Sequence, residues 1–196
     1  MIGLVMAGGR GTRLGCGEKP LIPITGIPMI SWVLSALYRA QLRPIYGVVT
    51  EYTPQTEVFL KKEGVFTIHT SGKGFIEDMR EAIMEKSLSE EVLVISADIP
   101  LITPCILTFI MSVYDHCYHP ALAVYTTSHF CSLQGIEKEE KISPAGINIL
   151  SGRRILDNPE AVQPEYRLII DRIEVALNIN TKKDLEYLKT LYPQHL

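Results

Sequence analysis

The sequence lacks the features that mark disulfide-stapled, secreted and membrane-spanning proteins. Its four cysteines form no C-x-x-C pair, which predicts free thiols in a reduced, cytoplasmic protein. No basic segment followed by an apolar run opens the chain, because loop glycines already appear at position 8. No apolar stretch approaches the roughly 18 residues that a membrane span requires. Internal repeats are also missing, so we expect a single domain over the 196 residues.

Charge of one sign is scarce as well, since the formal net charge is only −3. Such a balance gives no general attraction to nucleic acid or to an anionic membrane surface. We therefore expect no nucleic acid and no membrane among the partners, and the basic residues must act at local sites. The hydrophobic fraction of 46% is ordinary for a globular protein.

A glycine-rich loop stands close to the start of the chain. Residues 2–6 form a short apolar run of the length of a buried strand, and residues 7–15 read Ala-Gly-Gly-Arg-Gly-Thr-Arg-Leu-Gly. A loop with few side chains exposes its backbone N–H groups, and a concave row of such donors suits an anion. Arg10, Arg13 and Lys19 add three positive charges within ten residues. A polyphosphate is the simplest ligand for this combination.

Two familiar phosphate-binding loops do not fit this stretch. A Walker A loop needs Gly-Lys followed by Ser or Thr, which the stretch does not contain. A dinucleotide fingerprint needs Gly-x-Gly-x-x-Gly; Gly9 and Gly11 are correctly spaced, but Leu14 stands where the third glycine belongs. The loop is therefore a phosphate site of another class, or else a flexible turn without a ligand.

Alternating periodicities predict an α/β fold for the first half of the chain. Apolar residues at i, i+3, i+4 and i+7 predict a helix over residues 28–41. The pattern continues with a strand over 45–50, a helix over 53–62 and a strand over 65–69. This βαβαβ order predicts a mostly parallel, twisted sheet with right-handed crossovers. We expect a three-layer α/β/α, Rossmann-like architecture.

A second loop, Thr70-Ser71-Gly72-Lys73-Gly74, precedes a helix predicted over residues 75–86. In a doubly wound sheet this loop lies at the carboxyl ends of the strands, on the same edge as residues 7–15. We therefore expect the two loops to form one nucleotide cleft. A guanine base needs both donors and acceptors, which the amides of residues 71–74 and a carboxylate such as Glu77 can supply. A helix cap by Thr70 or Ser71 is an alternative role, and the two roles are compatible.

An aspartate follows the most apolar strand of the sequence. Residues 92–96 predict a central strand buried on both faces, and Asp98 follows in Ala-Asp-Ile-Pro. A carboxylate buried at a strand end needs a partner, and Mg²⁺ usually takes one or two carboxylates together with substrate phosphates. Asp98 is therefore a candidate Mg²⁺ ligand, with Asn178 or Asn180 as a neutral second contact. The alternative is a cap for the helix that begins near Pro104.

The second half of the chain alternates less regularly. We expect a helix over residues 104–114, a strand over 121–126, a solvated polar excursion over 128–141 and a strand over 147–150. Gly146 precedes that strand and is a candidate for close backbone approach to the ligand. Residues 168–176 are strand-like, and residues 177–181 are expected to close the sheet. Thr181 and Asp184 form a cap pair for a final helix.

Three motifs taken together resemble the nucleotidyltransferases with a GlmU- or MobA-like fold. They are Ala7 to Gly15 with Lys19-Pro20-Leu21, then Asp98-Ile99-Pro100, and finally Asn178-Ile179-Asn180-Thr181. The resemblance implies that the first loop wraps the phosphates of an NTP, that Lys19 contacts them and that Asp98 binds the metal. The Gly-Pro-Leu-Ala-Gly of the MobA branch is missing before residue 75. Residues 70–78 and 144–148 instead resemble the archaeal adenosylcobinamide-phosphate guanylyltransferases of cobalamin biosynthesis.

That resemblance implies a reaction in which the phosphate of adenosylcobinamide phosphate attacks the α-phosphorus of GTP and pyrophosphate leaves. Such a nucleophile is already ionised, so no general base is required, and no obvious Ser-His or Cys-His pair is present. Catalysis would rest on positioning and on charge neutralisation by protein cations, loop amides and Mg²⁺. The expected residues are Arg13, Lys19 and Asp98 for catalysis; Ala7, Gly8, Gly9, Arg10, Gly11, Thr12, Arg13, Lys19, Thr70, Ser71, Gly72, Lys73, Gly74 and Gly146 for the nucleotide; and Asp98, Asn178 and Asn180 for the metal.

Two alternatives stay open at this point. The nearer one is another nucleotidyltransferase of this fold, with molybdopterin or a sugar phosphate as its acceptor. The farther one is a GTP-binding protein that has kept the loops and lost the chemistry, although the presence of Arg13, Lys19 and Asp98 argues against such a loss. The sequence is compatible with a homodimer as well as with a monomer.

Overall fold

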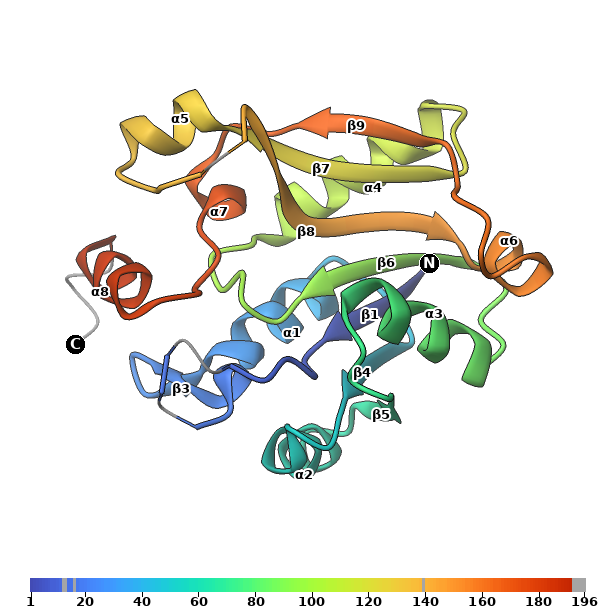
Figure 1. Ribbon diagram of the computed structural model, residues 1–196, viewed down its shortest axis with the longest axis horizontal. Coiled ribbons are helices and arrows are strands. Elements are labelled where there is room, and N and C mark those ends of the chain that lie inside the picture. The colour runs from blue at the N-terminus through green and yellow to red at the C-terminus, as the bar shows by residue number, and fades with distance from the viewer. Residues whose placement is uncertain (12–13, 16, 139, 192–196) are drawn as a thin grey trace.

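The computed structural model describes residues 1–11, 14–15, 17–138 and 140–191 (Figure 1). Two of the predicted site residues, Thr12 and Arg13, lie outside these ranges. Within them the main sheet has seven strands in the order β5-β4-β1-β6-β8-β7-β9. Their bounds are β1 (Ile2–Met6), β4 (Ile45–Val49), β5 (Phe66–His69), β6 (Glu91–Ser96), β7 (Ala121–Thr127), β8 (Ile142–Ser151) and β9 (Glu165–Ile169).

Strand direction confirms the predicted mostly parallel sheet. β1 pairs in parallel with β4 and β6, β4 with β5, and β7 with β9. β8 is antiparallel to both of its neighbours, β6 and β7. A small ribbon of β2 (Pro23–Ile24) and β3 (Ile27–Pro28) follows the first loop and the short 3-10 turn η1 (Lys19–Leu21). The parallel strands therefore end at one edge of the sheet, where ligands bind in open α/β sheets.

Helices cover both faces, which makes the predicted three layers. Buried side chains of α1 (Met29–Arg39), α2 (Pro54–Lys62) and α4 (Pro104–His116) join one apolar cluster on one face of the sheet. Those of α3 (Phe75–Glu85) and α6 (Gly152–Asp157) join a second cluster on the other face. The central strand β6 contributes to both clusters, with Leu93 and Ile95 on one side and Val92 and Val94 on the other. No helix of the described residues has the length and apolar character to cross a membrane.

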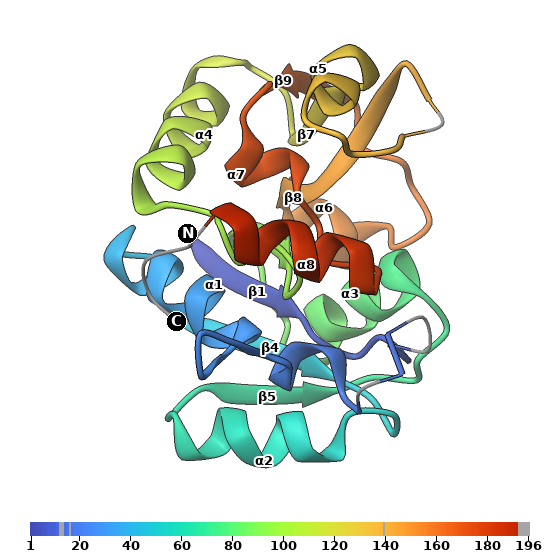
Figure 2. The same ribbon diagram turned by 90° about the vertical axis from the view of Figure 1, so that its left-hand side faces the viewer.

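A third cluster joins the two ends of the chain at the carboxyl edge of the sheet. Leu177, Ile179 and Leu188 pack there with Leu14 and Met29. The last helix, α8 (Lys182–Leu191), lies across this edge in Figure 2. The C-terminal segment is thereby held over the strand ends, next to the first loop.

The predictions for residues 28–126 are confirmed to within a few residues at each helix and strand end. The strand predicted over residues 147–150 is longer, because β8 runs from Ile142 to Ser151. Gly146 was expected just before the strand, but it lies within it, where it has a φ of +77° and the pairing with β7 shifts register. A bulge of this kind accommodates a glycine that a regular strand disfavours.

Three further expectations were wrong. The polar excursion over residues 128–141 contains α5 (Ser128–Leu133), which Thr127 caps and which buries Cys131. Residues 168–176 divide into the end of β9 and a short helix, α7 (Ile173–Ala176). Residues 177–181 do not join the sheet; Leu177 and Ile179 alternate with polar residues because they enter the third cluster. The expected cap pair of the last helix is confirmed, since Asp184 N donates to Thr181 Oγ1 at 3.2 Å.

Candidate active site

The first loop leaves β1 as a cradle of free backbone amides. Thr50, which follows β4, anchors it by donating from Oγ1 to Gly8 O at 2.7 Å. A Cβ at Gly8 would lie 2.5 Å from Thr50 Cγ2, so only glycine permits this approach. The backbone N–H groups of residues 8–11 donate to no other group in the described part of the chain. Such unsatisfied donors at a strand end are suited to phosphate oxygens.

Arg10 of this loop is held by an aromatic residue that the sequence did not single out. Its Nη2 donates to Tyr52 Oη at 2.8 Å, and its guanidinium carbon lies 4.4 Å from the centre of the Tyr52 ring. Both residues line one cleft of about 310 Å³ with Gly8, Gly9, Gly72, Lys73 and Gly74. The expectation that the two glycine loops share a cleft is therefore confirmed.

The second loop differs from the first because its amides are already used. The N–H groups of Gly72, Lys73 and Gly74 donate to the Asp78 carboxylate at 2.9, 3.3 and 3.4 Å. Ser71 donates to Glu81 Oε2 from its amide at 2.9 Å and from its hydroxyl at 2.8 Å. These hydrogen bonds, the amide first, hold the pKa of Glu81 below its ordinary value. Two carboxylates of α3 thus hold the loop in place.

Two expectations for this loop are corrected by that arrangement. The amides of residues 71–74 are not free donors for a base, since carboxylates of the following helix accept from them. Neither Thr70 nor Ser71 caps α3, whose N-cap is Gly74. Asp78 lies in the first turn of α3, where a carboxylate also suits the helix dipole. Its reach back to three amides follows from the φ values of +70° at Gly72 and +142° at Gly74.

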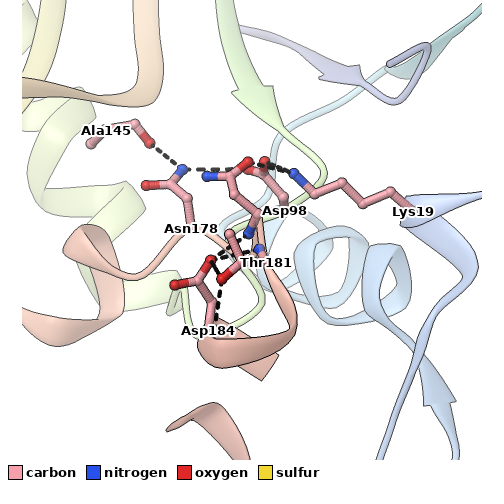
Figure 3. Close-up of polar contacts among 7 residues, drawn as sticks. Lys19, Asp98, Ala145, Asn178, Thr181 and Asp184 are labelled. Atoms are coloured by element: carbon pink, nitrogen blue, oxygen red, sulfur yellow. Dashed lines mark hydrogen bonds and ion pairs between the residues drawn. The ribbon is translucent and has the colours of Figure 1, made fainter. Parts of the chain in front are cut away.

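Lys19 and Asp98 meet at the centre of the carboxyl edge (Figure 3). Lys19 Nζ forms an ion pair with Asp98 Oδ2 and donates to Asn180 Oδ1 at 2.9 Å. Asn178 Nδ2 donates to Asp98 Oδ1 at 3.3 Å and to Ala145 O at 3.2 Å. Asp98 is not a helix cap, because Thr103 caps α4. The structure therefore brings together four of the predicted residues, which come from three distant parts of the chain.

Local hydrogen bonds fix the two asparagines over Asp98. Ile179 N donates to Asp98 O at 2.9 Å, which ties the segment between them to the end of β6. Asp184 Oδ2 accepts from Asn180 N at 2.9 Å and from Thr181 N at 2.7 Å. The start of α8 thus sets the position of this segment. Gly146 packs against it from β8, where an added Cβ would lie 3.2 Å from Ser96 Cβ and 3.6 Å from Asn178 Nδ2.

The oxygen atoms at this point suit a hard divalent cation. Asn178 Oδ1 is buried and has no hydrogen-bond partner in the described residues. Asn178 turns Nδ2 rather than Oδ1 toward Asp98, so the oxygens that meet at Lys19 are those of the Asp98 carboxylate and Asn180 Oδ1. One charged and one neutral oxygen ligand are the kind of set that a cation with substrate phosphates uses. The described residues hold no group of three or more His, Cys, Asp and Glu side chains placed for a metal. A cation bound here would therefore also need oxygen atoms from the substrate phosphates.

Glu18 is a further residue that the sequence analysis missed. Its carboxylate accepts from Gln55 N at 2.8 Å and from both Thr56 N and Thr56 Oγ1 at 2.6 Å. It therefore caps the amino end of α2, whose own N-cap residue, Thr53, makes no capping hydrogen bond. Because Lys19 is the next residue in the chain, this clamp also fixes the backbone position from which the Lys19 side chain extends. The long separation between Glu18 and Thr56 left no local signal.

A second hollow of about 630 Å³, here called the β8 groove, adjoins this constellation. Ser96 and Phe75 line both the cleft between the two loops and the groove. Asp98 lines the groove and also, with Gly9, Lys19 and Ser96, a small hollow at this junction. Pro144, Gly146, Asn148 and Leu150 of β8 form its floor. The predicted position of Gly146 beside a ligand space is consistent with this geometry.

Comparisons with known proteins agree with this arrangement. The model of the MobA-like NTP transferase domain matches residues 3–165. The chain is 34% identical over 202 aligned positions to the adenosylcobinamide-phosphate guanylyltransferase of Methanocaldococcus jannaschii, and the alignment covers 97% of each protein. It is 26% identical to a probable molybdenum cofactor guanylyltransferase of Methanosarcina acetivorans, over 93% of this chain and 87% of that protein.

Solved structures show the same fold. A putative glucose-1-phosphate thymidylyltransferase from Bacillus anthracis superposes with a TM-score of 0.71 at 14% identity, covering 99% of this chain and 96% of that one. A transferase structure from Thermus thermophilus gives a TM-score of 0.67 at 20% identity, covering 94% and 100%. At these identities the likeness concerns the fold alone.

Proposed function

Because the chain belongs to the MobA-like NTP transferase family, we propose that it transfers GMP from GTP to adenosylcobinamide phosphate, giving adenosylcobinamide-GDP and pyrophosphate. The observation that carries the transferase chemistry is the meeting of Lys19, Asp98 and Asn180 beside the first loop and at the end of the β8 groove. The acceptor is supported by the relative from M. jannaschii, whose printed name gives this activity. The enzyme would act in the cytoplasm.

The first loop is the triphosphate site in this proposal. Its free amides at residues 8–11 and the Arg10 guanidinium supply donors on one side of the cleft. Lys19 supplies a positive charge that can adjust its position, since the ammonium group is carried on a flexible side chain. Thr12 and Arg13 complete the predicted phosphate contacts. Neutralisation of the charge that develops on the departing pyrophosphate is the main catalytic task in such a transfer.

The second loop selects the base. Guanine presents donors at N1 and N2, which require acceptors in the cleft. Asp78 lines the cleft. The hydrogen bonds between the loop and the α3 carboxylates use the loop amides and not the loop carbonyls. A site built around such acceptors leaves them unpaired when adenine binds, which penalises ATP.

Asp98 and Asn180 would hold Mg²⁺ through oxygen ligands. When bound, Mg²⁺ would neutralise phosphate charge during displacement at the α-phosphorus. The acceptor phosphate forms the new bond to the α-phosphorus as the bond to the β-phosphate oxygen breaks. No protein base is needed, because the acceptor phosphate is already an anion. The role of the chain is to position both substrates and to exclude water from the junction.

The experiment measures pyrophosphate release from GTP with no acceptor and with each of three acceptors: adenosylcobinamide phosphate, molybdopterin and a hexose 1-phosphate. We expect release only with the corrinoid. Release with another acceptor would assign the chain to a different branch of the family. No release with any acceptor, together with tight GTP binding, would favour a binding protein without catalysis.

A further inference from the structure

The β8 groove owes its shape to the alternation of side chains along one antiparallel strand. Ala145, Ile147 and Ile149 point to the face that α4 covers and are buried. Pro144, Gly146, Asn148 and Leu150 alternate with them, are at least partly exposed, and line the groove. The groove therefore runs along β8 from the Asp98 junction, on the α3 side of the sheet.

Large apolar side chains are exposed at the rim of this groove. Phe75 and Ile76, in the first turn of α3, are 39% and 54% exposed, and Val162, in the segment after α6, is 88% exposed. All three line the groove, as does the buried Met79. Exposed apolar residues that gather around one hollow mark a ligand or partner site more often than scattered ones do.

The charges of the groove favour an anion with an apolar body. Its two carboxylates are already engaged: Asp98 with Lys19, and Glu165 with Tyr125 Oη at 2.9 Å and Arg167 Nε at 3.0 Å. Its cations are Arg80 and Lys138. Among the described residues Arg80 pairs with Glu160 at 3.3 Å, and because the Glu160 side chain is 88% exposed this pair is weak.

We propose that Ile76 and Val162, which line the β8 groove, select an acceptor whose phosphate is carried on a bulky body. The acceptor phosphate lies at the Asp98 end, and the body extends along β8 between Ile76 and Val162. This inference rests on the proposed function, because adenosylcobinamide phosphate carries its phosphate on a short arm of a large corrin ring.

The test uses Ile76→Glu and Val162→Glu, with Val58→Glu as the matched control. Val58 lies on α2 and is 54% exposed, the same fraction as Ile76, but it does not line the groove. A glutamate in the first turn of α3 suits the helix dipole, so Ile76→Glu should keep the fold. Binding of adenosylcobinamide phosphate is measured by equilibrium dialysis, read from corrin absorbance, with and without a GTP analogue that cannot release pyrophosphate.

We expect both groove variants to bind the corrinoid at least tenfold more weakly and to raise its KM, with the KM for GTP and the binding of GTP unchanged. Val58→Glu should behave as the wild type. If the wild type binds and consumes the corrinoid and both groove variants match it, the groove assignment is wrong while the proposed function stands. If the wild type neither binds nor consumes it, the proposed function fails, and the acceptor assignment fails with it.

Discussion

The Lys19 ammonium group forms an ion pair with the Asp98 carboxylate, which is the group expected to bind the metal. The same ammonium group contacts Asp98 Oδ2 and Asn180 Oδ1, which are two of the three predicted ligand residues. A cation cannot use those oxygens while Lys19 holds them. The phosphates of a bound nucleotide offer Lys19 another partner, so nucleotide binding should free Asp98.

This contact predicts the metal affinity of the free protein. Lys19→Met should bind Mn²⁺ in the absence of nucleotide about tenfold more tightly than the wild type, since charge-assisted contacts are worth about 1.5–3 kcal/mol. The same variant should bind GTP at least tenfold more weakly. Calorimetric titrations with Mn²⁺ alone and GTP alone measure both, with Lys62→Met on the exposed side of α2 as the control. Equal Mn²⁺ affinity in wild type and Lys19→Met would contradict the account.

The Glu18 clamp on α2 should matter for both stability and nucleotide binding. Glu18→Ala removes the acceptor for two backbone amides and a hydroxyl, and loss of a helix cap costs about 1 kcal/mol. We expect this loss in urea denaturation, with a several-fold higher KM for GTP because Lys19 loses its anchored neighbour. Glu57→Ala removes a partly buried carboxylate of the same helix, which pairs only with the exposed Lys61 among the described residues, and should change neither quantity. A stable Glu18→Ala variant with normal GTP kinetics would show that the clamp is incidental.

Base selection should be sensitive to the volume of the second loop. A Cβ at Gly72 would lie 3.0 Å from Tyr52 Cε2, and one at Gly74 would lie 2.9 Å from Glu77 Oε2. Gly72→Val and Gly74→Val should therefore weaken GTP binding about tenfold or more and reduce the preference for GTP over ATP. Gly64→Val is the control for backbone strain, because Gly64 has a φ of +73° and open space around its Cβ position. Titration of both nucleotides decides the matter: equal GTP and ATP affinity in the wild type would remove this loop from base selection.

The brace between Ser71 and Glu81 predicts an acid-sensitive contribution to stability. The folded pKa of Glu81 is lowered, so its stabilising effect is present above the unfolded pKa of about 4.3 and is lost as pH falls through the folded value. The melting temperature of the wild type should exceed that of Glu81→Gln near neutral pH. The two melting temperatures should converge only once the pH falls below this lowered, folded-state pKa. A constant difference down to low pH would mean that the charge of Glu81 is not involved.

Much of the site was predictable because its residues lie at strand ends. The apolar run before Ala7 and the apolar strand before Asp98 fixed two neighbouring parallel strands, and their carboxyl ends must meet at one edge. Asp98 therefore lies at the same edge as the first loop, and Asn178 contacts it, as one of the two expected alternatives. The contacts of Lys19 with Asp98 and Asn180 were not predicted. The clamp by Glu18 and the stacking of Tyr52 on Arg10 depend on contacts across 38 and 42 residues, for which local patterns give no signal.

Other errors arose where one sequence pattern is compatible with two structural roles. The alternation of Leu177 and Ile179 with asparagines is typical of a strand. Here the segment is not a strand: its apolar side chains pack in the third cluster, and the side-chain amide of Asn178 donates to Asp98. Asp78 was consistent with a dipole-stabilising acid, and only the three-dimensional turn of the loop shows that it accepts from loop amides. In both cases the tertiary contact determined the role.

The central claim is guanylyl transfer to a corrinoid phosphate at Asp98. The most direct measurement incubates GTP radiolabelled at the α-phosphorus with adenosylcobinamide phosphate and Mg²⁺, and then separates the corrinoids by chromatography. We predict that the label moves into a new corrinoid in equal amount to the pyrophosphate released, and that Asp98→Asn, folded by circular dichroism, transfers none. Label that stays in GTP with the wild type, or undiminished Mg²⁺-dependent transfer by Asp98→Asn, would contradict the account.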